Sequence, residues 1–134
     1  MKLIACIAKN KGMTFLGKRL SRDSVLREKI LELSHGKRLL MNSYSAKQFE
    51  DISAITVDDD FLNMASDNDF CFIEDVNPDI QNIDSIYLFN WNRDYPADFF
   101  FEIEPKECGF KRVSSQDFKG SSHEKITLDI YKKI

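Results

Sequence analysis

The sequence contains few residues of the kinds that bind metals or form cross-links. It has only two histidines, His35 and His123, and three cysteines, Cys6, Cys71 and Cys108, with no Cys-x-x-Cys spacing. Structural zinc sites use closely spaced Cys and His ligands, and disulfide frameworks use an even number of cysteines. We therefore predict no metal site, and we expect reduced cysteines in a cytoplasmic protein.

Long apolar runs are also missing. No stretch of about 18 apolar residues occurs, so the sequence predicts no membrane-spanning helix. The opening M-K-L-I-A-C-I-A is apolar, but Lys9, Asn10 and Lys11 follow at once. This run is too short for a signal peptide and is typical of a strand buried on both faces of a parallel sheet.

Basic residues are scarce in the middle of the chain. Residues 51–104 contain fourteen Asp and Glu but only one basic residue, Arg93, whereas residues 1–50 contain eleven Lys and Arg. Such a block exceeds ordinary mixing of surface charges and predicts a basic partner. The carboxylates that we expect to contact this partner are Asp58, Asp59, Asp60, Asp67, Asp69, Glu74 and Asp75.

Aromatic residues accompany the acids near the end of this block. Residues 94–104 read D-Y-P-A-D-F-F-F-E-I-E. The three consecutive residues Phe99, Phe100 and Phe101 cannot all face the same side of a strand, because side chains alternate. We expect one of them to be exposed, and the mixture of carboxylates and rings suits a surface that binds a basic protein.

The remaining pattern alternates between strands and helices. Residues 24–35 carry one apolar stripe of a helix that Asp23 or Ser24 can cap. Residues 36–49 read G-K-R-L-L-M-N-S-Y-S-A-K-Q-F, a buried strand that runs into a helix reaching about Asp51. We predict a loop over residues 9–22 and an antiparallel hairpin at the end of the chain. The pattern favours one α/β domain over residues 1–134 with a mixed sheet.

These elements resemble those of dihydrofolate reductase. Lys2 to Leu20 is similar to the family's first strand and flexible loop, and L-L-M-N-S-Y-S-A-K-Q-F is similar to its V-x-M-G-R-x-T-x-x-S-I. S-I-Y-L-F-N-W resembles a later central strand, and the chain resembles a shortened, degenerate member of the family, with the shortfall in its middle. The resemblance implies a three-layer α/β sandwich with a mixed, mostly parallel sheet. It also implies a pocket lined by Ala5, Cys6, Leu26, Ile30, Phe49 and Phe89.

The sequence departs from the family pattern at the positions that carry its chemistry. Leu26 stands where the family has its single acid, and Phe89 stands where a hydroxyl residue accompanies that acid. Asn42-Ser43 replaces a Gly and a basic residue that meet the NADPH phosphates. Glu74-Asp75 replaces a glycine pair, and two carboxylates repel a diphosphate.

Two functions therefore remain open. The first is a reductase-like fold without catalysis or cofactor, which acts as a binding or inhibitory protein against a basic nucleic-acid-binding protein. The second is a divergent NADPH-dependent reductase of dihydrofolate or a related pterin. Its proton would come from Asp23, Glu28 or an ordered water. Its cofactor phosphates would be held by Lys18, Lys37, Arg38 or Ser43.

Overall fold

The computed structural model of the protein describes all residues, 1–134. A seven-stranded sheet has the order β5-β4-β6-β1-β7-β10-β9, and a three-stranded sheet has the order β3-β2-β8. The strands are β1 (Lys2–Ile7), β2 (Gly12–Phe15), β3 (Lys18–Arg19), β4 (Leu39–Met41), β5 (Ile55–Val57), β6 (Phe70–Ile73), β7 (Ser85–Asn90), β8 (Phe99–Phe100), β9 (Phe110–Phe118) and β10 (Ile126–Lys133). The helices are α1 (Ser24–Leu33), α2 (Ser43–Ala46), α3 (Phe61–Met64) and the 3-10 helices η1 (Ile80–Asn82) and η2 (Pro105–Cys108).

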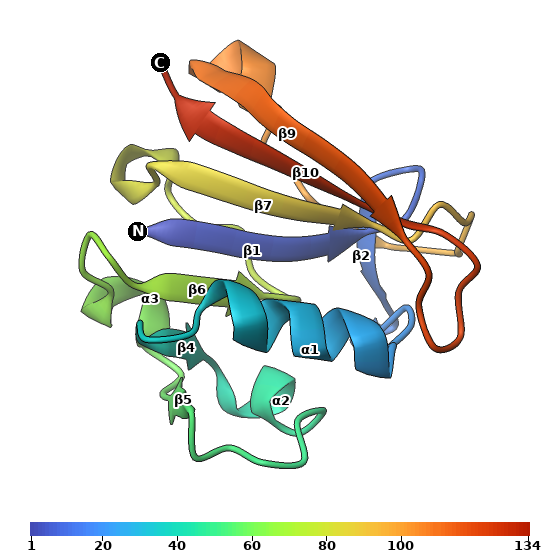
Figure 1. Ribbon diagram of the computed structural model, residues 1–134, viewed down its shortest axis with the longest axis horizontal. Helices are drawn as coiled ribbons and strands as arrows, with labels where there is room; N and C mark the ends of the chain where they lie inside the picture. The colour runs from blue at the N-terminus through green and yellow to red at the C-terminus, as the bar shows by residue number, and fades with distance from the viewer.

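The large sheet is parallel on one side and antiparallel on the other. β1 pairs in parallel with β6 and β7, and β4 pairs in parallel with β5 and β6. β10 is antiparallel to both β7 and β9. The five parallel strands therefore end at one edge of the sheet, on the right of Figure 1, which we call the carboxyl edge. β1 is the central strand of the seven.

Helices α1 and α2 cover one face of the large sheet (Figure 1). Leu26 and Ile30 of α1 are buried against Ile4 of β1 and Phe89 of β7, in one apolar cluster. Gly36, with a φ of 78°, then turns the chain back into β4. A left-handed φ of this kind is the usual way for glycine to end a helix.

The opposite face is covered by α3, the small sheet and the segment that follows it. Phe61 of α3 and Phe101 are buried there against Leu3 of β1 and Ile86 of β7. Strand residues alternate between the two faces, so the core has one apolar layer on each side of the sheet. The result is three layers, with few helices.

Two predicted elements differ from the structure. Residues 9–22, predicted as a loop, contain the hairpin β2–β3, because Leu16 and Gly17 adopt positive φ values of 51° and 75° and β2 pairs with β8. The helix expected to reach about Asp51 ends much earlier, since α2 covers only Ser43–Ala46.

The predicted architecture is confirmed in its main features. The sheet is mixed and mostly parallel, and the chain ends in the antiparallel hairpin β9–β10. Phe100 is the exposed member of the three phenylalanines, at 41% exposure, while Phe101 is buried. All three cysteines are free thiols. None of the helices has the length and apolar character that crossing a membrane requires.

Candidate functional site

The carboxyl edge carries polar residues directly after three neighbouring parallel strands. Asn42 follows β4, Asp58 follows β5, and Glu74 follows β6. In open α/β sheets, ligands bind beyond the carboxyl ends of the strands. We therefore build the candidate site here, beside β4, β6 and α1, and call it the α1 site.

The interior of the α1 site is filled by the protein's own apolar side chains. Leu26 is 2% exposed and Phe89 is fully buried, and both belong to the cluster beneath α1. Ile30 and Phe49, two other predicted pocket residues, are buried in the same cluster. Phe89 also meets Phe118 edge to face, with ring centroids 6.1 Å apart. These residues form packed core where the resemblance implied a pocket.

The other two predicted pocket residues lie on opposite faces of the sheet. Ala5 is buried in the cluster on the far face, because alternate residues of β1 point in opposite directions. Ala5 therefore does not line the α1 site. Cys6 packs at the edge of the cluster beneath α1. Burial raises the pKa of the Cys6 thiol well above its usual value, and the nearby Glu74 carboxylate raises it further.

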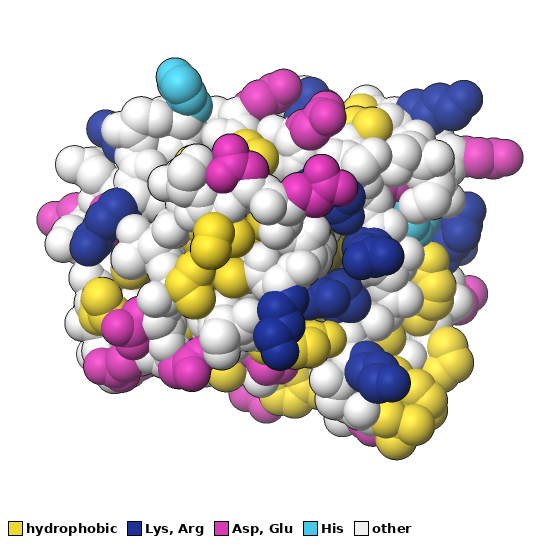
Figure 2. Space-filling view, turned by 90° about the horizontal axis from the view of Figure 1, so that it is seen from below, with side chains coloured by type: hydrophobic (Ala, Val, Ile, Leu, Met, Phe, Trp, Pro, Cys, Tyr) yellow, Lys and Arg dark blue, Asp and Glu magenta, His cyan; other side chains and the backbone are white.

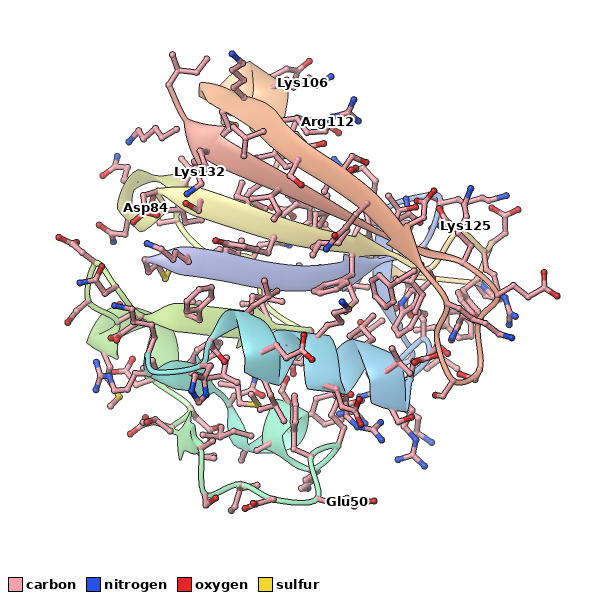
Figure 3. The ribbon with its side chains drawn as sticks, in the orientation of Figure 1. Glu50, Asp84, Lys106, Arg112, Lys125 and Lys132 are labelled. Carbon is pink, nitrogen blue, oxygen red and sulfur yellow. The ribbon has the colours of Figure 1, made fainter.

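A shallow pocket remains open at the outer end of the α1 site. It has a volume of about 260 Å³ and lies between α1 and the segment after α2, where Figure 3 labels Glu50. Figure 2, which views the molecule from this side, shows Lys and Arg side chains gathered beside a hollow. Glu28 lines this pocket on α1. It is exposed there, away from the buried position of Leu26.

The hydrogen-bond donors that follow β4 are bound to carboxylates of the same chain. The backbone N–H and hydroxyl of Ser43 both donate to Asp59 Oδ1, at 3.0 Å and 2.9 Å. The side-chain amide of Asn42 donates to Asp75 Oδ1 at 2.8 Å. Hydrogen bonds from Ser43 lower the pKa of Asp59. Ser43, which the alternative function would use to hold a cofactor phosphate, and its neighbour Asn42 therefore already have anionic partners.

Arg19 pairs with the polar residue that follows β6, and this role was not apparent from the sequence. Its guanidinium donates to both carboxylate oxygens of Glu74, at 2.9 Å and 3.2 Å. It also lies 4.6 Å from the ring centroid of Tyr44, whose hydroxyl accepts a hydrogen bond from the Arg19 backbone. Glu74 is only 8% exposed and is held by this pair. The signal was hidden because Arg19 lies in the hairpin that was predicted to be a loop.

The structure does not bring the four predicted phosphate-binding residues together. Lys37 and Arg38 precede β4, while Ser43 follows it, so they lie at opposite ends of that strand. Arg38 also donates from two nitrogens to the buried Asp69. Lys18 lies exposed in β3. The alternative cofactor site is thus divided among separate places.

Asp23 is the N-cap of α1 and is buried. It accepts hydrogen bonds from the backbone of Val25 and Leu26 and from the backbone of Ser121 and Ser122. Burial alone would raise the pKa of Asp23, but these bonds outweigh it and hold the pKa far below its usual range. A carboxylate held ionised in this way has no proton to donate, so Asp23 is poorly suited to be the alternative proton source.

His123 binds Asp23 from the other side. Its Nδ1 lies 3.0 Å from Asp23 Oδ2, and its Nε2 lies 3.2 Å from the Ser21 hydroxyl and 3.1 Å from the Tyr95 hydroxyl. The ring stacks on Trp91, with centroids 4.5 Å apart. The cluster ties the start of α1 to the loop before β10. The sequence did not reveal this cluster, because His123 and Asp23 are a hundred positions apart.

The predicted acidic contacts separate into exposed and buried residues. Asp69 and Glu74 are buried in ion pairs with arginines, so they do not belong to an exposed surface. Asp67 is exposed but precedes β6, away from the carboxyl edge. The remaining four follow β5 and β6 at that edge. We call them the acidic surface: Asp58, Asp59, Asp60 and Asp75.

An aromatic side chain lies close to the acidic surface. Asn77, two residues after Asp75, donates to the backbone carbonyl of Phe100 at 3.0 Å and accepts from the backbone of Glu102 at 3.1 Å. These bonds hold β8 beside the end of β6. Phe100 and Glu102 are both exposed, and their backbone is bound to the segment that follows Asp75.

The three-layer architecture belongs to a known fold class, that of dihydrofolate reductase. No family model and no curated protein matches the sequence. Among solved structures, the chain is similar to dihydrofolate reductase from Enterococcus faecalis complexed with NADP(H) and RAB-propyl. The match has a TM-score of 0.65 at 10% identity and covers 98% of this chain and 94% of that chain. This likeness shows that the fold is dihydrofolate-reductase-like.

Proposed function

We propose that this protein is a cytoplasmic, dihydrofolate-reductase-like binding protein that has lost catalysis and uses no cofactor. The observation that carries this proposal is the burial of Leu26 and Phe89 in one apolar cluster at the α1 site. A reductase needs an ionisable group and room for its substrate near the transferred proton. An aliphatic and an aromatic side chain supply neither.

The charges at the carboxyl edge support the same proposal. NADPH carries roughly four negative charges, and its diphosphate needs free N–H donors or cations. Here Ser43 is bound to Asp59, Asn42 to Asp75, and Arg19 to Glu74. Binding of a cofactor phosphate would have to displace carboxylates from these partners. The fold is then a scaffold whose former ligand contacts stabilise the protein itself.

The acidic surface gives the scaffold a face for a partner. Asp58, Asp59, Asp60 and Asp75 are exposed on adjacent segments, with Phe100 beside them. Carboxylates arranged in this way attract basic protein surfaces and resemble the phosphates that nucleic-acid-binding proteins recognise. We propose that the partner is a basic nucleic-acid-binding protein, and that occupation of its basic site inhibits it.

A divergent NADPH-dependent reductase is the second candidate, and the likeness to a solved dihydrofolate reductase favours it. A thermal unfolding experiment separates the two. Bound at 100 times its dissociation constant, a ligand stabilises the protein by about 2.7 kcal/mol. We expect no shift of the unfolding temperature with NADPH or a folate analogue. A clear shift with both ligands would support the reductase and contradict the loss of its sites.

A binding experiment tests the acidic surface. The tagged protein is incubated with nuclease-treated lysate, so that nucleic acid cannot bridge the partners, and captured proteins are identified by mass spectrometry. We expect capture of a basic nucleic-acid-binding protein that is lost when Asp58, Asp60 and Asp75 become Asn. The matched control changes the exposed acids Glu32, Asp94 and Glu107 to Gln, Asn and Gln, which removes the same charge elsewhere. Equal capture by both variants would exclude the acidic surface.

A further inference from the structure

A second pocket lies at the carboxyl edge on the other side of β1. It has a volume of about 360 Å³, within the range of small-molecule sites. Three segments build it: the residues directly after β1, the residues directly after β7, and the residues before β10. We call it the basic pocket, and its lining residues are Lys9, Trp91, Asn92, Arg93, Glu124 and Lys125.

The cations of the basic pocket are almost free of carboxylate partners. Lys9 forms no ion pair, and Arg93 donates only to the backbone carbonyl of Ser122, at 3.3 Å. Lys125 lies 3.9 Å from Asp117, but both side chains are more than half exposed, so solvent screens this pair. Three positive charges therefore face one hollow, and Glu124 is the only carboxylate in its lining.

The floor and walls of the basic pocket are held in place by the fold. Trp91, only 4% exposed, stacks on His123, which is fixed by Asp23. Asn92 adopts a φ of 58°, and its side-chain amide donates to the Lys125 carbonyl and the Thr127 hydroxyl at 3.1 Å and 2.9 Å. The backbone N–H of Lys9 donates to the Arg93 carbonyl at 3.0 Å. The backbone that carries the three cations is thus preorganised before any ligand arrives.

We propose that the basic pocket binds a small phosphate ester that also carries a hydroxyl group. The phosphate would bind Arg93, Lys125 and Lys9, because charge-assisted hydrogen bonds to phosphate are strongest from such groups. Glu124 accepts hydrogen bonds and repels a bare anion, so it selects a ligand with a hydroxyl donor beside its phosphate. A phosphorylated sugar has this chemistry. The site is separate from the α1 site and independent of the acidic surface.

The test uses Trp91, which is the single tryptophan of the chain and lines the pocket. Inorganic phosphate and ribose 5-phosphate are titrated at constant ionic strength, with tryptophan fluorescence and the backbone amide NMR shifts of residues 9, 93 and 125 as readouts. We expect saturable changes with both, and tighter binding of ribose 5-phosphate. Absence of shifts at these amides up to millimolar ligand would overturn the proposal.

Charge variants locate the ligand. Arg93→Gln and Lys125→Gln should each weaken binding about tenfold. Lys106→Gln is the matched control, because Figure 3 places this exposed lysine at the opposite end of the sheet from Lys125. Unfolding midpoints confirm that each variant is folded. Equal weakening by all three variants would overturn the site, since it would reflect total charge alone.

Glu124→Gln tests the second part of the proposal. It should strengthen binding of inorganic phosphate, because it removes a like charge, and reduce the preference for ribose 5-phosphate. If phosphate and ribose 5-phosphate bind equally well to the unaltered protein, the selection of a hydroxyl-bearing ester is wrong.

Discussion

At the carboxyl edge, the charged and polar groups are paired on one side of β1, and the cations are almost unpaired on the other. In the α1 site, the polar groups after β4 and β6 are paired with Asp59, Asp75 and Arg19, and the apolar interior is filled. In the basic pocket, after β1 and β7, three cations face a hollow with almost no carboxylate contacts. The same sheet thus has one site whose interior is filled, which we call the closed side, and one that is open.

This difference teaches how a fold can keep its shape while a ligand site changes. Strand ends and helix starts expose donors whether or not a ligand is present. A chain that binds no anion there must satisfy them internally, and Asp59 and Asp75 do so. The three cations of the basic pocket differ, because the fold holds them together although they form almost no stabilising ion pair. We take such unpaired charges as an indication of a ligand site.

The largest effect that we predict comes from opening the closed side with Phe89→Ala. The side chain is fully buried and packs against Phe118, so its removal should cost about 3–5 kcal/mol of unfolding free energy. Urea unfolding measures this cost. Phe100→Ala is the control, and at 41% exposure it should change stability by no more than about 0.5 kcal/mol. Similar costs for both variants would mean that the α1 site is loosely packed.

Asp23 lies beneath the open side, and Asp23→Asn should lower the free energy of unfolding by about 2 kcal/mol at neutral pH. The substitution removes the charge of a buried carboxylate that accepts several hydrogen bonds. The pKa of Asp23 is lowered in the folded state. Its contribution is therefore complete above the unfolded pKa of about 4 and declines as the pH falls below it.

Urea midpoints of the wild type and Asp23→Asn, measured from pH 7 to about pH 3, test this linkage. The difference in stability between the two proteins should be largest at neutral pH and shrink toward acid pH. A difference that stays constant over this range would show that the charge of Asp23 contributes nothing, and that only its shape matters.

Glu74→Gln breaks the ion pair between Glu74, which follows β6, and Arg19 at the carboxyl edge of the α1 site. The amide can accept from Arg19 with one oxygen only, so we expect a loss of about 2 kcal/mol in urea unfolding. Glu102→Gln, on the exposed segment after β8, is the matched control and should be near neutral. If Glu74→Gln is also neutral, the closed side does not depend on internal charge pairing.

The sequence predicted the fold where local patterns and tertiary structure agree. The apolar run of β1 and the stripe of α1 specify buried elements by themselves, and the terminal hairpin follows from its alternating residues. The β2–β3 hairpin was missed because its pairing partner, β8, lies more than eighty residues further along. Pairing between distant segments leaves little trace in either one.

The sites were predictable to a smaller extent. The sequence showed that Leu26 and Phe89 depart from the family's acid and hydroxyl residue, but it implied a pocket where both side chains are in fact buried in packed core. The acidic block was visible as composition, but the sequence could not show that Asp69 and Glu74 belong to ion pairs with Arg38 and Arg19. The basic pocket was invisible for the same reason, since its cations come from three distant segments.

The smallest predicted effect concerns two neighbouring serines of α2, on the closed side. Ser45 is fully buried, and its hydroxyl has no hydrogen-bond partner, whereas the exposed Ser43 hydroxyl donates to Asp59. Ser45→Ala removes a buried unpaired group and favours the helix, so it should be neutral or stabilise by up to about 0.5 kcal/mol. Ser43→Ala should instead lower the urea midpoint slightly. A cost above about 1 kcal/mol for Ser45→Ala would mean that this hydroxyl has a partner, and that pairing on the closed side extends to every polar group of α2.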